Sequence, residues 1–339
     1  MAGYNVAIVG VTGNVGQVLV EVLRQRNFPV KGWKLLASAH SAGKKVNIGG
    51  QEYSVEEAKP ESFNGVDFAF FSAGGDVSKE LAPEAAKRGA IVVDNSSAFR
   101  MDPEIPLVVP EVNPDAVSRH KGIIANPNCS TIQMVVALQP LHLKAGIKRV
   151  VVSTYQSVSG AGKEAMDETA TQSYAVLDKK EVLKKIIPYK AAAKHHQIAF
   201  NVVPHIDVFD EDDYTKEELK MIRETRKIMD LPELPITVTT VRVPVFNGHS
   251  ESLNVELNAP LSPGEAREVF SKAPGIVVWD NPAELLYPMP VDTEGRDEVF
   301  VGRIRIDRSV PFGLNMWVVA DNIRKGAATN SVQIAELLL

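Results

Sequence analysis

The single cysteine of the chain stands where a thiol could react. Cys129 lies in the segment Asn126-Pro-Asn-Cys-Ser-Thr131, directly before the helical pattern TIQMVVALQPLHL. The positive end of a helix dipole stabilises a thiolate, which is the nucleophilic form of cysteine. This placement favours a nucleophile. A lone cysteine is by default a small buried apolar side chain, so both interpretations stay open from this residue alone.

Three glycines near the N-terminus predict a phosphate-binding turn. They follow a short apolar run, residues 4–10, and lead into an amphipathic segment, residues 14–26. A glycine-rich turn between a strand and a helix lets backbone N–H groups approach a pyrophosphate. The spacing is GxxGxxG instead of GxGxxG, yet its place after a strand favours dinucleotide binding over a purely structural turn. The expected contacts are Gly10, Thr12, Gly13, Asn14, Val15 and Gly16.

The end of the second expected strand indicates which dinucleotide would bind. NAD sites usually carry an acidic residue about 20 residues after the turn, where it holds the ribose hydroxyls. Here the corresponding stretch is Ala37-Ser-Ala-His-Ser-Ala-Gly-Lys44, which has hydroxyls and a cation but no carboxylate. We therefore expect NADP, with Ser38, Ser41 and Ala42 near its 2′-phosphate. A solvated surface loop is the alternative.

No metal is expected. One cysteine rules out an intrachain disulfide and a cysteine-rich zinc site. The adjacent pair His195 and His196 has no carboxylates at ligand spacing and reads as a solvated helix end or loop.

The pattern of the chain predicts two tightly joined α/β domains. Strand-like and helix-like segments alternate up to about residue 146, which is typical of a doubly wound parallel sheet. Longer runs with period-two alternation follow, which predicts a second α+β domain with one covered sheet face. We expect a Rossmann-like nucleotide domain of residues 1–131, completed by the closing helix 315–339, and a catalytic and dimerisation domain of residues 132–314.

Composition excludes several classes of protein. Hydrophobic residues make up 45% and charged residues 23% of the 339 residues, which is typical of a folded globular chain. A net charge of −5 gives no general attraction to nucleic acid or anionic membranes. The sequence shows neither a leader-like N-terminus nor a long apolar run, so we expect a cytoplasmic protein.

Seven ordered motifs give the chain a family resemblance. They are GVTGNVG, FSAGG, DNSSAFRMD, NPNCST, TYQSVSGAG, EELKM and RVPVFNGHSE. Together they resemble the aspartate-β-semialdehyde dehydrogenase family from end to end. The resemblance implies NADP-dependent reductive dephosphorylation of L-aspartyl-4-phosphate to the semialdehyde, in lysine, threonine, methionine and diaminopimelate biosynthesis. It also implies a homodimer.

The resemblance assigns roles to the reacting groups. Cys129 matches the nucleophile that would displace phosphate and form a thioester, and His249 matches the acid/base, for which a pKa near neutrality would suit. Gln156 matches the residue that orients the acyl intermediate, and its amide could donate to an oxyanion. Arg242 could grip the substrate α-carboxylate through paired hydrogen bonds, although alone it could be a sheet-surface cation.

The remaining roles concern phosphate, the ammonium group and the cofactor. Arg100 and Lys220 match phosphate ligands, and Glu217, one helical turn before Lys220, matches the carboxylate that binds the substrate ammonium group. Taken alone, EELK is an ordinary exposed helix. The resemblance places Ser159, Gly160 and Asn315 near the nicotinamide and the cofactor phosphates, although Asn315 could equally cap the closing helix.

Three other classes of protein share part of this pattern. An N-acetyl-glutamyl-phosphate reductase shares the chemistry but usually carries Gly-Cys-Tyr-Pro around its cysteine, and a glyceraldehyde-3-phosphate dehydrogenase carries Ser-Cys-Thr-Thr and an acidic NAD-binding residue. A noncatalytic binding protein with this fold would be expected to lack the nucleophile, the base or the cations. All of these residue types are present here.

Overall fold

The computed structural model describes residues 3–339, which form two compact units. One consists of the chain through Asn128 together with Ala327–Leu339, and the other is Cys129–Gly326. The expected boundary at 131 lies close to Asn128, whereas the expected boundary at 315 lies twelve residues before Ala327 (327 − 315), because Gly313–Ala320 is a strand and not part of the expected closing helix. Cys129 and residues 315–326 belong with the second unit, because the helix and the strand that carry them pack in its sheet and helix layers.

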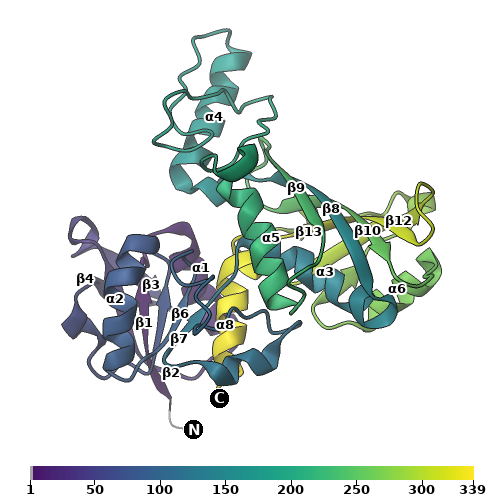
Figure 1. The fold of residues 1–339 in the computed structure, drawn as a ribbon. Helices are drawn as coiled ribbons and strands as arrows, with labels where there is room; N and C mark the ends of the chain where they lie inside the picture. Colours follow the sequence, from purple (N-terminus) through teal and green to yellow (C-terminus); the bar gives the residue numbers. More distant parts are fainter. Residues whose placement is uncertain (1–2) are drawn as a thin grey trace. The chain divides into compact units, whose positions relative to one another are not determined.

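The first unit is built on a seven-stranded sheet of order β3-β4-β2-β1-β5-β6-β7 (Figure 1). All neighbouring pairs are parallel except β3 and β4. Parallel sheets are covered on both faces, which explains the continuous apolar runs such as FAFF. The predicted doubly wound sheet is therefore confirmed. The strands are Tyr4–Val9, Val30–Ala37, Lys45–Ile48, Gln51–Glu57, Phe68–Phe71, Ile91–Asp94 and Ile123–Ala125 for β1 to β7.

Helices cover both faces of this sheet. On one face α1 (Asn14–Gln25) and α8 (Thr329–Glu336) pack side by side, and their apolar side chains share one buried cluster with strand residues such as Ile8 and Phe70. On the other face α2 (Gly75–Lys87) shares a second cluster with Ala7 and Phe71. The C-terminal helix therefore completes the first unit.

The second unit contains a mixed six-stranded sheet of order β11-β12-β13-β10-β8-β9. Buried and more exposed side chains alternate along its strands, and the buried face is covered by α3 (Cys129–Ala145). Helix α3 packs in turn with α5 (Lys216–Ile228) and α6 (Pro263–Lys272). The opposite face carries half-buried side chains such as Tyr155 and Trp317. The strands β8 to β13 are Ile147–Gln156, Ile236–Arg242, His249–Leu257, Ile276–Val278, Val299–Asp307 and Gly313–Ala320. A short helix, α7 (Pro290–Thr293), lies in the loop between β11 and β12.

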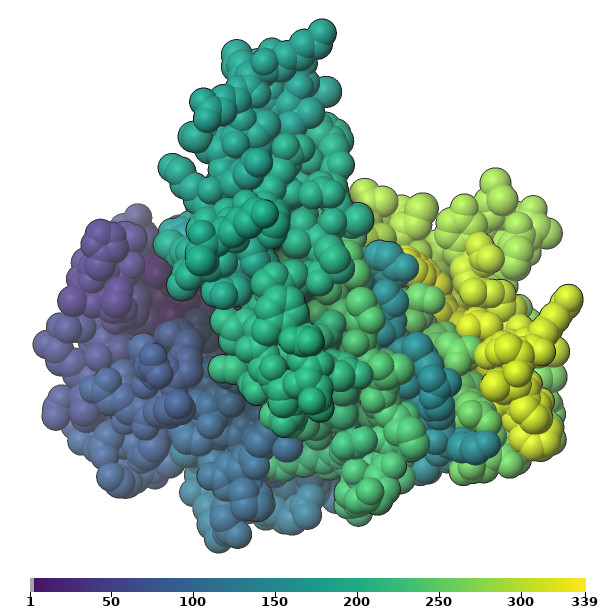
Figure 2. All heavy atoms as spheres, turned by 45° about the horizontal axis from the view of Figure 1, so that its top comes forward, coloured from purple at the N-terminus to yellow at the C-terminus, as the bar shows by residue number. Residues whose placement is uncertain are grey.

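An excursion between β8 and β9 starts with α4 (Lys163–Leu177). Figure 1 shows this teal segment extending beyond the strands of the six-stranded sheet, and in Figure 2 the same teal atoms project from the surface. Helix α4 ends at Leu177, and Lys179, two residues later, adopts a left-handed φ of 56°. A small apolar cluster, including Ala165, Ile187 and Ile198, packs the excursion together.

Candidate active site

The candidate site lies at one edge of the six-stranded sheet. Strands β8 and β9 are parallel, so their last residues, Gln156 and Arg242, stand side by side. Strand β10 runs the other way, so its first residue, His249, lies at the same edge. Register alone thus brings together three side chains that are far apart in the sequence.

Cys129 is the first residue of α3, as the sequence predicted, and its side chain is half-buried. The positive end of the helix dipole favours a negative charge there. Gly326 lies against it so closely that a Cβ at position 326 would come 2.8 Å from the Cβ of Cys129. Only glycine can therefore occupy this place without displacing the nucleophile or the backbone beside it.

The His249 imidazole is completely buried and oriented by Ser157. The backbone N–H of Ser157 donates to Nδ1 over 3.1 Å, and the Ser157 hydroxyl lies 3.0 Å from the same atom. A neutral imidazole that accepts at Nδ1 carries its hydrogen on Nε2. Within residues 3–339, Nε2 has no hydrogen-bond partner. The imidazole therefore presents an N–H donor to a reacting group.

Burial, reinforced by the Arg242 charge, lowers the pKa of His249 to about 3. The near-neutral pKa expected from the sequence does not hold for this environment, because loss of hydration disfavours the imidazolium form. The negative charge of Glu217 acts in the opposite direction but does not offset the burial.

Arg242 is 4% exposed, and its Nη1 donates to the carbonyl oxygen of Ser157 over 2.6 Å. Burial lowers the pKa of Arg242, whereas the negative charges of Glu217 and Cys129 raise it. This coupling shows that the cation, the carboxylate and the sulfur share one environment. The Nε atom of Arg242 is buried and has no partner among the described residues, so it remains available to an incoming carboxylate.

Gly160 lies over both Arg242 and His249. A Cβ at position 160 would come 3.0 Å from Nη1 of Arg242 and 3.2 Å from Cε1 of His249. The structure therefore brings the predicted residue Gly160 into the site, where a larger side chain would crowd the imidazole.

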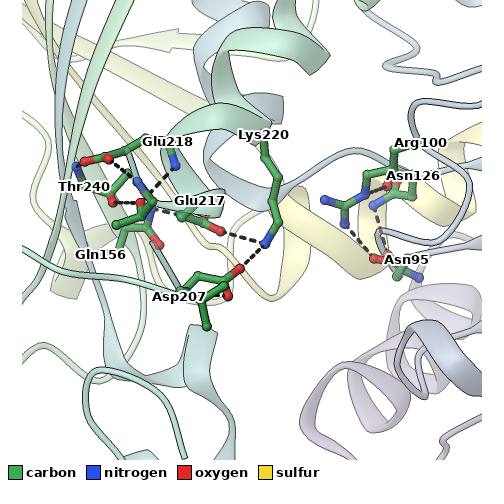
Figure 3. A network of polar contacts seen from close by, with 11 residues as sticks. Asn95, Arg100, Asn126, Gln156, Asp207, Glu217, Glu218, Lys220 and Thr240 are labelled. Carbon is green, nitrogen blue, oxygen red and sulfur yellow. Dashed lines mark hydrogen bonds and ion pairs between the residues drawn. The ribbon is translucent and has the colours of Figure 1, made fainter. Parts of the chain in front are cut away.

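Helix α5 supplies a carboxylate and a cation. Its start is set by a capping box between Thr215 and Glu218. One oxygen of Glu217 accepts from Gln156 Nε2 over 3.3 Å, and the other lies 3.2 Å from Lys220 Nζ (Figure 3). Glu217 is only 6% exposed, so the expectation from the helix pattern alone, an exposed ion pair, is not what the structure shows.

Asp207 was missed by sequence reasoning. Its Oδ2 accepts from Lys220 Nζ over 2.7 Å, so Lys220 lies between two carboxylates (Figure 3). Asp207 adopts a left-handed φ of 70°, which aspartate tolerates better than most residues. No local pattern marks Asp207, because its partner lies on the following helix.

A second missed residue is Asn322, which organises the loop behind His249. Its Oδ1 accepts from the Ser157 and Ser159 hydroxyls and from the Gly248 N–H, and its Nδ2 donates to Ser159. The structure does not bring the predicted Asn315 to Ser159. Asn315 is paired with Asn254 on the opposite face of the sheet from His249. Asn322 is the asparagine that contacts Ser159.

Arg100 belongs to the first unit and is 7% exposed. Its Nε donates to the carbonyl oxygen of Asn126 over 2.9 Å and its Nη2 to that of Asn95 over 2.7 Å (Figure 3). The two expected phosphate cations, Arg100 and Lys220, thus come from different units.

The glycine turn of the first unit fits a dinucleotide phosphate. Gly10 has a φ of +88°, and a Cβ there would meet the Ser72 carbonyl oxygen at 2.4 Å. A Cβ on Gly16 would meet the Gly10 carbonyl oxygen at 2.2 Å. Helix α1 follows at Asn14 without a side-chain cap at Gly13, so the backbone forms the surface that a pyrophosphate would approach. Thr12 and Val15 belong to the same turn and first helical residues.

The loop after β2 carries the other expected cofactor residues. Ser38 precedes a short 3-10 turn, Ala39–Ser41, and Lys44 Nζ lies 3.3 Å from the Ser41 hydroxyl. Ala42 follows the turn and is exposed. The loop therefore presents hydroxyls and an ammonium group in one place.

Two features are absent from residues 3–339. No group of three or more His, Cys, Asp or Glu side chains is placed to hold a metal ion. None of the described helices is long and apolar enough to cross a membrane.

Of the adjacent histidines His195 and His196, the first has its Nε2 within hydrogen-bond distance of the Lys190 carbonyl oxygen.

Two family models match the chain. The model described as semialdehyde dehydrogenase, NAD binding domain, matches residues 5–120, and the one described as semialdehyde dehydrogenase, dimerisation domain, matches residues 138–325. An aspartate-semialdehyde dehydrogenase of Aquifex aeolicus is 61% identical over 340 residues, covering 99% of this chain and 98% of the relative. One from Bacillus subtilis is 55% identical over 337 residues, covering 99% and 97%.

Solved structures agree with these matches. Aspartate semialdehyde dehydrogenase II from Vibrio cholerae has a TM-score of 0.94 and 48% identity, covering 99% of this chain and 98% of that one. The same enzyme complexed with ASA has a TM-score of 0.94 and 47% identity, covering 100% and 98%. A Candida albicans enzyme with NADP has a TM-score of 0.75 and 27% identity, covering 99% and 98%. This similarity extends over nearly the whole chain, which therefore belongs to the aspartate-semialdehyde dehydrogenase family.

Proposed function

We propose that the chain catalyses the reversible, NADP-dependent reductive dephosphorylation of L-aspartyl-4-phosphate to L-aspartate 4-semialdehyde, the step that leads toward lysine, threonine, methionine and diaminopimelate. The relatives' names support the reaction. The observation that carries the proposal is that strand register places Gln156, Arg242 and His249 at one edge of the sheet. Cys129 lies at the start of α3, which covers this sheet, and Glu217 accepts a hydrogen bond from Gln156.

In the proposed first step the Cys129 thiolate attacks the acyl carbonyl of the substrate. A carbon–sulfur bond forms, the carbon–oxygen bond to phosphate breaks, and phosphate leaves with the electron pair. The Gln156 amide and the His249 Nε2–H are N–H donors that can stabilise the oxyanion of the tetrahedral intermediate. When bound, reduced nicotinamide supplies the hydride.

The tautomer of His249 determines how it acts on the reacting oxygen. In the reducing direction Nε2–H donates a hydrogen bond to the alkoxide of the tetrahedral intermediate, which then forms the aldehyde carbonyl and releases the Cys129 thiolate. In the oxidising direction the thiolate attacks the aldehyde, and the same N–H stabilises the alkoxide that forms. Ser157 keeps the ring oriented through Nδ1, so the ring cannot turn its other nitrogen to the substrate without losing that hydrogen bond.

The substrate's charged groups have fitting partners. Arg242 has an unpartnered Nε beside a second nitrogen, which suits two parallel hydrogen bonds to the α-carboxylate. The Glu217 carboxylate would bind the free ammonium group. This carboxylate favours the aspartyl substrate over an N-acetylated one, because an acetamide group has no positive charge to offset its burial. Lys220 and Arg100 would bind the phosphate.

NADP is the proposed cofactor. The glycine turn would hold its pyrophosphate, the loop with Ser38, Ser41 and Ala42 would face the 2′-phosphate, and Ser159, Gly160 and Asn322 would lie near the nicotinamide. No acidic side chain stands at the end of β2 to hold a free ribose diol. A homodimer is proposed from the dimerisation-domain match.

The test is a direct assay. The protein is mixed with aspartate semialdehyde, inorganic phosphate and either NADP or NAD, and the absorbance of reduced nicotinamide is followed. We expect a signal that requires phosphate and is faster with NADP. N-acetyl-glutamate semialdehyde, as a parallel substrate, tests the reductase alternative. A folded protein that gives no phosphate-dependent signal with either substrate would instead be a binding protein.

A further inference from the structure

Glu251 is a buried carboxyl group to which no role has been given. It lies on β10 two residues after His249, on the same face of the sheet, and is 0% exposed. In the sheet register its neighbours are Thr154 on β8 and Val318 on β13. This face of the sheet is the one that α3 covers.

The surroundings of Glu251 contain no charge to balance a carboxylate. Neither carboxyl oxygen has a hydrogen-bond partner among the residues described, and no cation forms an ion pair with it. An unpaired charge in such a place would cost several kcal/mol, so the group is held as the neutral acid. Burial accordingly raises the pKa of Glu251 well above its usual value, while the neighbouring Gln133 side chain acts in the opposite direction.

Gln133 connects Glu251 with the reacting residues. It lies one helical turn after Cys129 on α3 and is 1% exposed. Its Nε2 donates to the backbone carbonyl oxygen of His249 over 3.3 Å. The side chain beside Glu251 therefore joins the helix that carries the thiol to the strand that carries the imidazole.

We propose that Glu251 is a positioning residue for the nucleophile and the histidine. The neutral carboxyl group lies on the face that α3 covers, beside the Gln133 side chain, where its O–H can donate to the amide oxygen and orient the amide. The oriented amide holds the first turn of α3 in a constant place relative to the start of β10. This inference rests on the proposed function, in which Cys129 and His249 react with the substrate. An error of about 1 Å in such a pair can cost roughly a hundredfold in rate.

An apolar side chain would be the more stable choice at this position. A methionine has a similar length and no polar atoms that need partners, so Glu251→Met should leave the melting temperature equal or higher. A group that serves only the packing of the sheet would show the reverse, a lower melting temperature with normal turnover. Stability and turnover thus separate the two roles.

The experiment compares Glu251→Met, Glu251→Gln and Leu253→Ala in the full chain. Leu253 is the matched control, since it is the next residue on the same face of β10 and is also buried. We expect Glu251→Met to lower kcat by roughly ten- to a hundredfold with KM for the semialdehyde within about threefold. Glu251→Gln, which keeps one donor and one acceptor, should restore kcat to within about threefold. Leu253→Ala should lower the melting temperature and leave kcat near normal.

The alkylation rate of Cys129 by iodoacetamide provides a readout that does not depend on turnover. It should fall in Glu251→Met and recover in Glu251→Gln. If Glu251→Met does not fold, Gln133→Met tests the same connection. If both fold, the double variant should be no slower than the slower single variant, because the two residues act in series.

Three outcomes would overturn the proposal. They are a normal kcat and alkylation rate in folded Glu251→Met, an equal loss in Glu251→Gln, and an equal loss of kcat in Leu253→Ala. Failure of the proposed function is recognised separately, because Cys129→Ser, assayed in parallel, would then retain turnover whatever the Glu251 variants do.

Discussion

Burial and charge act in opposite directions on Arg242. Burial lowers the pKa of this guanidinium, and the negative charges of Glu217 and Cys129 offset only part of that effect. The same cation lies near His249 and helps to keep that imidazole neutral. One guanidinium thereby favours an anionic sulfur and a neutral proton donor within the same site.

Cys129→Ser tests the nucleophile. Serine keeps the shape, but its hydroxyl is not ionised near neutral pH, so turnover should fall by orders of magnitude. NADP binding, measured by fluorescence titration, should be unchanged because the expected cofactor contacts remain. A variant that turns over at a near-normal rate would remove Cys129 from the mechanism.

The depressed pKa of His249 predicts how stability depends on pH. An unfolded histidine takes up a proton below about pH 6.5, whereas the buried one stays neutral down to about pH 3. The native protein therefore loses stability as the pH falls through this window, by roughly 2 kcal/mol at pH 5 from this residue alone. His249→Gln removes that loss.

The measurement compares melting temperatures of the wild type and His249→Gln between pH 7.5 and pH 5. The melting temperature of His249→Gln minus that of the wild type should increase as the pH falls. Exposed His40 provides a control, because His40→Gln should leave the difference constant. A difference that does not change with pH would mean that His249 is not held neutral.

At the scale of elements, α5 determines which groups face the substrate. The capping box at Thr215 sets where the helix starts, and the helical repeat then places Glu217 and Lys220 on one side. The preceding loop adds Asp207 to the other side of Lys220. Glu217 on the helix and Asp207 in the loop therefore balance the positive charge of Lys220 in the absence of a bound phosphate.

Lys220→Ala should raise KM for phosphate by about tenfold or more and leave the Kd for NADP within about twofold. Lys216→Ala is the matched control, since Lys216 lies on the same helix but is exposed. Phosphate-dependence curves and cofactor titrations give the two quantities. Equal losses for both ligands would show that Lys220 has another role.

At the scale of the whole chain, the C-terminus completes the N-terminal unit. Helix α8 packs against α1, and Arg26 forms an ion pair with Glu336. Val332, Ile334 and Ala335 are fully buried in the cluster that also contains Leu19 and Leu23. The nucleotide-binding unit therefore cannot form its whole core before the last residues of the chain are present.

Deleting residues 327–339 should expose this cluster and abolish cooperative folding of the first unit. Removing a single buried Ile or Val typically costs about 1–5 kcal/mol, so loss of the entire helix exceeds the usual stability of a domain. Limited proteolysis with and without NADP measures the effect. Cleavage should occur within residues 3–128, and NADP should give no protection. An unchanged, NADP-protected pattern would contradict the assignment of α8 to this core.

Local signals in the sequence predicted the parallel sheet, the glycine turn before α1 and a cysteine at the N-terminus of a helix. Each depends on residues that are near neighbours in the chain, so periodicity, turn chemistry and helix-start signals suffice. Only the tertiary structure decided the rest. Strand register brought Gln156, Arg242 and His249 to one edge and separated Asn315 from Ser159.

The protonation states were also decided by tertiary structure. The sequence offered His249 as a near-neutral base, but complete burial beside Arg242 and a backbone donor at Nδ1 make it a neutral N–H donor. Asp207, Asn322 and Glu251 could not be recognised at all, because each acts on a group that comes close only when the strands and helices pack. The sequence determines the residue types. Their charge states depend on burial, which removes hydrating water, and their partners depend on which strands and helices pack together.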